Sequence, residues 1–173
     1  MPRVISMDIT RCIDCRSCEA ACAREHDGRS NMFVQLMDER YSLPLNCRHC
    51  EGSPCVEACP TYAMTRVNED TVNIAPMRCI GCQLCAIACP FGAIWFDSLN
   101  KIVHKCDLCQ HRLARGLEPA CVITCSARAL HFGELNEMID IAKGRSLHTM
   151  ITRASGEYGT LVSIPIKWNG KGG

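Results

Sequence analysis

Cysteines are the residues of this chain most suited to bind metal or take part in redox chemistry. Sixteen of its 173 residues are cysteines, and they fall into four groups of four. The first and third groups have the spacing C-x2-C-x2-C-x3-C, the second is spaced x2, x4, x3 and the fourth x2, x11, x3. The groups are Cys12, Cys15, Cys18 and Cys22; Cys47, Cys50, Cys55 and Cys59; Cys79, Cys82, Cys85 and Cys89; and Cys106, Cys109, Cys121 and Cys125. No cysteine lies outside them.

Three chemistries use cysteines in such sets: disulfides, structural zinc and iron–sulfur clusters. No apolar secretory segment precedes Cys12, so we expect a cytoplasmic protein, in which disulfides are rare. Zinc ribbons use two separated C-x2-C pairs, whereas group one places four cysteines within eleven residues. The run C-x2-C-x2-C-x3-C is typical of bacterial ferredoxins, and Pro60 and Pro90 complete its C-P ending in groups two and three. The spacing therefore favours iron–sulfur clusters.

The spacing also indicates how many clusters to expect. In two-cluster ferredoxins the cysteines at x2 intervals bind one cluster, and the fourth cysteine of the run binds the other. Groups must then work in pairs, so four groups predict two pairs and four [4Fe–4S] clusters. The spacing alone does not say which group pairs with which.

The elements that position these groups are short. Aromatic residues make up only 5% of the chain, so we expect bound metal to replace much of a conventional core. Each fourth cysteine is expected to begin a short helix, and apolar residues at helical spacing predict a further helix over residues 134–143 that covers the cluster core. Strands are predicted at residues 4–7, 71–74, 93–96, 101–104 and 130–132.

Composition excludes several classes of protein. The 19 basic and 18 acidic residues give a net charge of +1, which argues against a nucleic-acid-binding protein. The longest uncharged stretch, residues 79–96, contains four cysteines, two glycines and a proline, so we reject it as a membrane span. We therefore expect contact with a membrane only through a partner. No nucleophile and base stand apart from the cysteines, so no catalytic residue is predicted.

Four segments resemble, in order, the motifs of the ferredoxin-type electron-transfer subunits that hold four [4Fe–4S] clusters. Such subunits accompany oxidoreductases of the dimethyl sulfoxide reductase and formate dehydrogenase type, formate-hydrogenlyase hydrogenases and nickel carbon monoxide dehydrogenase. The resemblance covers about residues 3–133. The segments are CIDCRSCEAACAREH (12–26), NCRHCEGSPCVEACPTYAM (46–64), RCIGCQLCAIACPFGAI (78–94) and KCDLCQHRLARGLEPACVITCSARAL (105–130).

The resemblance implies the pairing that spacing leaves open: group one with group four, and group two with group three. Each fourth cysteine then binds the cluster of the partner group. The implied ligand sets are Cys12, Cys15, Cys18 and Cys125 for cluster 1; Cys47, Cys50, Cys55 and Cys89 for cluster 2; Cys79, Cys82, Cys85 and Cys59 for cluster 3; and Cys106, Cys109, Cys121 and Cys22 for cluster 4.

The resemblance also implies an α+β fold, small and loop-rich, with two bacterial ferredoxin-like modules, one inserted in the other. Residues 1–45 and 98–143 would form the outer module and residues 46–97 the inner module. Residues 144–173 would be a C-terminal extension. A nearly linear row of clusters is expected to follow from this arrangement.

The function implied is that of a non-catalytic, cytoplasmic electron-transfer subunit of an anaerobic oxidoreductase complex. It would relay electrons between a catalytic subunit, of carbon monoxide dehydrogenase, hydrogenase or formate dehydrogenase type, and a second redox partner. The alternative is a free, diffusible polyferredoxin that serves several partners. Such carriers usually have a strongly acidic surface, so the net charge of +1 mildly favours a fixed subunit. A cluster enzyme would need an open iron site, and the cysteine count leaves none.

Three features leave alternatives open. Asp14 stands where a glycine is usual, and its carboxylate either lowers the potential of a nearby cluster or points to solvent. His49 lies inside group two, where we expect it to lie behind the ligands or at the surface. A basic run near group four either docks an acidic partner, balances cluster charge or is a solvated face; it comprises Lys101, Lys105, Arg112 and Arg115.

Overall fold

The structure, a computed structural model, describes residues 2–37 and 41–154. Contacts divide the chain into two compact units, Met1–Met138 and Ile139–Gly173. All four cysteine groups belong to the first unit. The predicted C-terminal extension lies outside the described residues from residue 155 onward.

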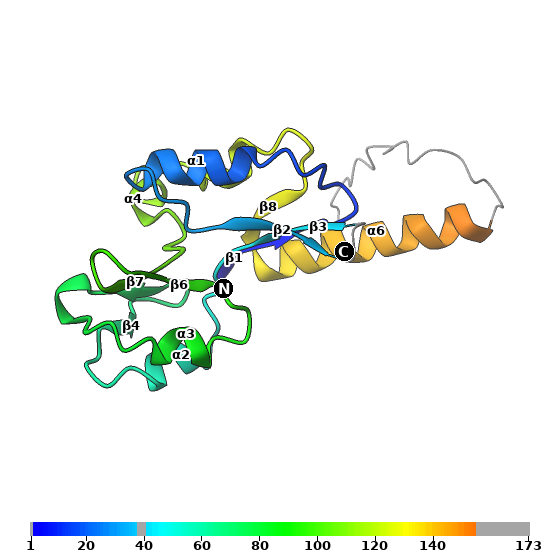
Figure 1. The fold of residues 1–173 in the computed structure, drawn as a ribbon. Coiled ribbons are helices and arrows are strands. Elements are labelled where there is room, and N and C mark those ends of the chain that lie inside the picture. Colours follow the sequence, from blue (N-terminus) through cyan, green and yellow to red (C-terminus); the bar gives the residue numbers. More distant parts are fainter. Residues whose placement is uncertain (1, 38–40, 155–173) are drawn as a thin grey trace. The chain divides into compact units, whose positions relative to one another are not determined.

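Two-stranded antiparallel sheets make up the β-structure of the first unit (Figure 1). β1 (Arg3–Met7) pairs with β8 (Leu130–Glu134), which brings segments far apart in the sequence side by side. β6 (Ile94–Asp97) and β7 (Ile102–Lys105) form a hairpin. These four strands were predicted from the sequence, and the structure confirms them to within two residues at each end.

Two further hairpins complete the set. β4 (Met64–Arg66) pairs with β5 (Val72–Ile74), and only β5 was predicted. β2 (Phe33–Met37) pairs with β3 (Tyr41–Leu45), and neither of these strands was predicted. Their sequences lack clean alternation, and β3 contains a proline, which weakens a strand signal.

Short helices contain the third cysteine of each group. Because the x3 spacing equals about one helical turn, the chain coils between the third and fourth cysteines. The prediction that a helix begins at the fourth cysteine was therefore wrong. The helices of the first unit are α1 (Ser17–Glu25), α2 (Pro54–Glu57), α3 (Leu84–Ala88), α4 (Gln110–Leu113) and α5 (Ala120–Ile123), with the 3-10 turn η1 (Pro76–Arg78).

The helix predicted at residues 134–143 is present as α6 (Leu135–Ala154) and is longer than expected. In the first unit, Met138 is buried and its sulfur accepts a hydrogen bond from the Ser6 hydroxyl at 3.1 Å. Leu135, on the same predicted face, is 42% exposed. Among the described residues, no helix has the length and apolar character needed to cross a membrane.

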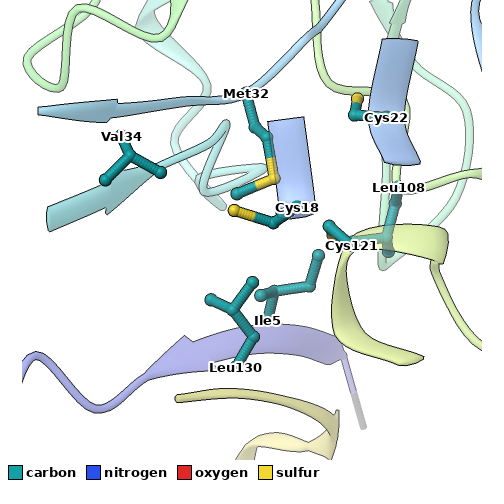
Figure 2. Packing of buried hydrophobic residues seen from close by; sticks show 8 residues of the cluster. All are labelled: Ile5, Cys18, Cys22, Met32, Val34, Leu108, Cys121 and Leu130. Carbon is teal, nitrogen blue, oxygen red and sulfur yellow. The ribbon is translucent and has the colours of Figure 1, made fainter. Parts of the chain in front are cut away.

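Thiols occupy positions in the core that aliphatic side chains would otherwise fill. Figure 2 shows Ile5 and Leu130, from β1 and β8, pointing toward the region of Cys18 and Cys121. A second core cluster is built around Met64, Val72, Cys85, Ile94 and Val103. No Phe, Tyr or Trp is fully buried in the described part of the chain.

Candidate iron–sulfur cluster sites

The four C-x-x-C loops share one backbone feature. The residue before the second cysteine has a positive φ in every group, a conformation that bends an otherwise extended chain sharply. Such a bend suits a loop whose cysteines must surround one metal cluster. The glycine of group three is the strongest sequence signal for it. The four φ values are 55° at Asp14, 48° at His49, 70° at Gly81 and 61° at Leu108.

Gly81 is the one of these four positions that also needs a missing side chain. A Cβ there would lie 2.5 Å from the Lys101 carbonyl oxygen and 3.3 Å from Cε2 of Phe96. At the equivalent position, the Asp14 carboxylate is 40% exposed and lies 3.5 Å from Nε of Arg16. The solvent-facing alternative therefore holds for Asp14, and solvent and Arg16 screen its charge.

The chain turns again just after the fourth cysteine. Tyr62, Gly92 and Arg128 each lie three residues beyond it, with φ values of 53°, 58° and 50°. Each donates its backbone N–H to the carbonyl of that cysteine, at 3.3, 3.3 and 3.0 Å. Group four thus ends as groups two and three do although it lacks their proline. Group one differs, because α1 continues through and past Cys22.

Thiols of groups one and four lie near each other. Burial raises the pKa of Cys18 to about 11, and the charge of Cys125 adds to the increase. Burial likewise raises the pKa of Cys109 to about 11, with Cys22 among the charges that contribute. The helices that contain the third cysteines, α1 and α5, are in contact. Each fourth cysteine therefore lies close to thiols of the other group.

Thiols of groups two and three are arranged in the same way, with the fourth cysteine of each group close to thiols of the other. Burial raises the pKa of Cys55 to about 11, and the charges of Cys47 and Cys89 add to it. Burial also raises the pKa of Cys85, with Cys59 contributing. Helices α2 and α3 are in contact. A hollow beside α3 is lined by Cys59, Cys79, Cys82 and Cys85, with mainly apolar walls from Ala63, Met64, Ile74, Ile80 and Val103.

Groups two and four are in contact near the end of the β6–β7 hairpin, where β7 ends directly before Cys106 of group four. Cys47, Cys106 and Ala93 are buried against one another. Burial raises the pKa of Cys106 to about 12, and the charge of Cys47 adds to the increase. Lys105, which precedes Cys106, is 4% exposed.

The surroundings of the thiols fit iron–sulfur clusters. All sixteen cysteines are free thiols. Backbone N–H groups point at several sulfur atoms, and such donors stabilise thiolates and tune cluster potentials. The donors are Asn31 to Cys22 at 3.2 Å, His49 to Cys47 at 3.4 Å, Leu108 to Cys106 at 3.4 Å and Ala129 to Cys125 at 3.2 Å. Sulfur donors, apolar walls and N–H groups together form a suitable environment for [4Fe–4S] clusters.

His49 lies behind the group-two thiols and is buried. Its Nδ1 accepts a hydrogen bond from the Val72 backbone N–H at 3.0 Å. Burial, assisted by the positive charges of Lys105 and Arg66, lowers the pKa of His49 to about 3, so the ring is neutral. Its Nε2 has no hydrogen-bond partner among the described residues. His49 is therefore a buried support of the loop.

His26 is a residue near the thiols that the sequence analysis did not single out. Its Nε2 lies 3.9 Å from Sγ of Cys109 and 3.4 Å from a carboxylate oxygen of Asp107. Its ring also packs edge-on against His111, with centroids 5.7 Å apart. An imidazole in this place can donate a hydrogen bond to the Cys109 sulfur. No local motif marks it, because His26 is 83 residues away from Cys109 in the sequence.

The predicted basic run does not form one exposed face. Lys105 is buried, and Arg112 donates to Glu25 at 2.7 Å and to the Glu118 carbonyl at 2.9 Å. Lys101 and Arg115 are exposed. Two of the four residues are thus used inside the fold, which argues against a docking face made by all four.

Comparison with known proteins gives consistent matches. A family model described as a 4Fe-4S dicluster domain matches residues 38–135, and a 4Fe-4S binding domain matches residues 9–25. The thiosulfate reductase electron transfer subunit PhsB of Salmonella typhi is 37% identical, over 78% of this chain and 77% of that protein. Formate hydrogenlyase subunit 2 of Escherichia coli is 34% identical, over 83% and 87%. The B subunit of the anaerobic dimethyl sulfoxide reductase of Escherichia coli is 33% identical, over 76% and 73%.

Proposed function

This chain belongs to the family of 4Fe–4S ferredoxin-type electron-transfer subunits, and we propose that it relays electrons through four [4Fe–4S] clusters between a catalytic oxidoreductase subunit and a second redox partner. The sixteen cysteines fit four clusters with none to spare. Each bound cluster would supply a one-electron redox centre. The chain itself would hold, space and tune these centres without catalysing a reaction.

The observation that carries the proposal is that the fourth cysteine of a group lies close to the thiols of its partner group. The hollow lined by Cys79, Cys82 and Cys85 is completed by Cys59 of group two. The electrostatic contacts of Cys89, Cys22 and Cys125 point to the same arrangement in the other groups. These contacts support the four ligand sets implied by the resemblance, and we propose those sets here.

We also propose that two ferredoxin-like modules are nested, with residues 46–97 inserted between residues 1–45 and 98–143. Two contacts support this division. β1 pairs with β8, and α1 contacts α5, so the start of the chain meets its later part. Between these elements, α2 contacts α3 and the β4–β5 hairpin follows α2, all within residues 46–97. The β6–β7 hairpin joins the inner module to the second part of the outer one.

A fixed partner is favoured over free diffusion. The stretch around the group-three loop exposes large apolar side chains: Met77 is 98%, Ile80 66% and Ile87 81% exposed. Cys82, in the same stretch, is also exposed. Apolar side chains beside an accessible thiol suit a lasting interface with a redox partner. We propose a catalytic subunit of carbon monoxide dehydrogenase, hydrogenase or formate dehydrogenase type, and a cytoplasmic location in which thiols stay reduced.

Purification under anaerobic conditions tests this function. The protein should carry about 16 iron atoms per chain, four for each cluster. A catalytic subunit that stays bound at high salt supports the fixed complex. A partner that dissociates at moderate salt supports the free carrier, and a protein without iron contradicts both.

Single-cysteine variants test the ligand sets. Under the proposed ligand sets, Cys125→Ser and Cys12→Ser should remove the same cluster signal in electron paramagnetic resonance (EPR) spectra, since both residues belong to one set. Cys121→Ser, although it alters the same sequence group as Cys125→Ser, should remove a different signal. The proposed ligand sets are wrong if Cys125→Ser and Cys121→Ser remove one signal and Cys12→Ser removes another.

A further inference from the structure

Lys105 is a buried cation at the junction of two cysteine groups. It ends β7 and is 4% exposed, and among the described residues no other Lys or Arg is buried to this extent. Its Nζ donates hydrogen bonds to the carbonyl oxygens of Val72 and Cys106, the latter at 2.7 Å. A lysine ammonium has three donors and no acceptor, and burying one is costly unless something compensates its charge.

Carbonyl oxygens satisfy two of the three donors of Lys105 and leave its net charge. In the described part of the chain, no carboxylate forms an ion pair with Nζ. Negative charge nearby can arise at the thiols of Cys55 and Cys106, on both of which the charge of Lys105 acts, and at the Asp107 carboxylate, which also acts on Cys106. Geometry links Lys105 to both groups, because its ammonium donates to the carbonyl of Cys106 in group four and to that of Val72, whose N–H donates to His49 in the group-two loop.

The position of Lys105 is fixed from two sides. The Val72 carbonyl accepts its hydrogen bond, while the Val72 N–H donates to the neutral ring of His49. In the β6–β7 register, Lys105 lies opposite Ile94, next to the buried contact of Ala93 with Cys47 and Cys106. The ammonium therefore cannot turn into solvent without breaking its hydrogen bonds to Val72 and Cys106.

We propose that Lys105 is a tuning residue, whose buried charge is shared by the metal centres that groups two and four hold and raises the reduction potential of one or both. The proposal rests on the proposed function. Reduction adds one electron, delivered by a redox partner, and no bond or proton changes. A fixed cation favours the more negative, reduced form, and its effect is larger in an interior of low dielectric constant.

Lys101 supplies the matched control. It lies four residues earlier, in the turn of the same β6–β7 hairpin, and its side chain is exposed. Solvent and salt screen an exposed charge, so its removal should change potentials little. Lys105→Arg keeps the charge and serves as the conservative variant.

The experiment is a redox titration of the anaerobically purified complex, followed by EPR. For Lys105→Gln we expect one or two of the four potentials to fall, by about a tenfold change in the one-electron equilibrium, which is 59 mV. Iron content should stay unchanged. Lys101→Gln should leave all four potentials unchanged, and Lys105→Arg should keep them near the wild-type values.

A shift no larger than that of Lys101→Gln, or an equal shift of all four potentials, would overturn the inference while the proposed function stands. Absence of four clusters in the wild-type protein would overturn the proposed function itself. If Lys105→Gln loses iron, Lys105→Met offers a similar volume without charge. In the wild-type protein, potentials tuned by Lys105 should also respond less to added salt than the others, and an equal response of all four contradicts the proposal.

Discussion

Gly81 offers the sharpest test of how the cluster loops are built. It has a φ of 70°, and a Cβ at this position would meet the Lys101 carbonyl oxygen at 2.5 Å. Gly92 has a similar φ of 58°, but a Cβ there would have no neighbour within 4 Å. Gly81→Ala and Gly92→Ala therefore share the conformational strain and differ in the steric clash.

The expected magnitudes follow from these two contributions. An alanine in the left-handed region costs about 1–2 kcal/mol, and this cost applies to both variants. The clash at Gly81 is with backbone atoms, which cannot turn away as a flexible side chain can, and forcing such a contact costs a further ~1–3 kcal/mol. We therefore expect Gly81→Ala to be less stable than Gly92→Ala by about 1–3 kcal/mol.

Loss of the visible absorbance of the clusters during anaerobic urea unfolding would measure this difference. With an m value of about 2 kcal/mol per M urea, the midpoints of the two variants should lie about 1 M apart. Because released iron makes unfolding irreversible, both variants must be compared after the same incubation time. Equal midpoints, or a lower midpoint for Gly92→Ala, would refute the idea that the close approach of Lys101 requires glycine.

Other variants test neighbouring conclusions. Asp14→Gly should relieve a positive φ and raise stability in the same urea assay by up to ~1 kcal/mol, with cluster potentials unchanged at physiological salt because Arg16 and solvent already screen the charge; a clear rise in one potential would contradict the screening. Ile87→Glu should weaken co-purification with the catalytic partner, whereas Leu36→Glu, at a 54% exposed position in β2, should not; equal effects would contradict a partner at the group-three stretch. Removing iron with a chelator should abolish near-UV circular dichroism, since seven cysteines belong to the buried core; an unchanged spectrum would show that the core packs without metal.

The sequence predicted which metal centres the sites hold better than it predicted the backbone conformation of the loops that form them. Cysteine spacing was enough to indicate clusters, because ligand number and spacing follow directly from metal coordination. The left-handed bend at Leu108 could not be predicted, since leucine does not favour positive φ. Aspartate and histidine are enriched at positive φ but usually adopt negative values, so Asp14 and His49 carry a much weaker signal than Gly81.

The fold shows the same limit. Strands with regular alternation were predicted within two residues, whereas neither strand of the β2–β3 hairpin was predicted. Its place depends on contacts distant in the sequence, since Val34 packs in the core and donates its N–H to Glu19 of α1. Likewise, Lys105 reads as part of a basic surface run, and only the tertiary structure shows that it is buried.

The pairing of β1 with β8 has a consequence for synthesis of the protein on the ribosome. Met7 lies opposite Leu130, so β1 cannot pair with β8 until roughly 120 further residues have been made. At about 5–20 residues per second, this delay lasts about 6–24 seconds. During that time the thiols of group one leave the ribosome without the helix α5 that α1 later contacts. Groups two and three lie much closer in sequence, so they can meet early. Iron delivery to the nascent chain should therefore follow an order in which the earliest-made cysteines are enclosed last and stay exposed to oxidants longest.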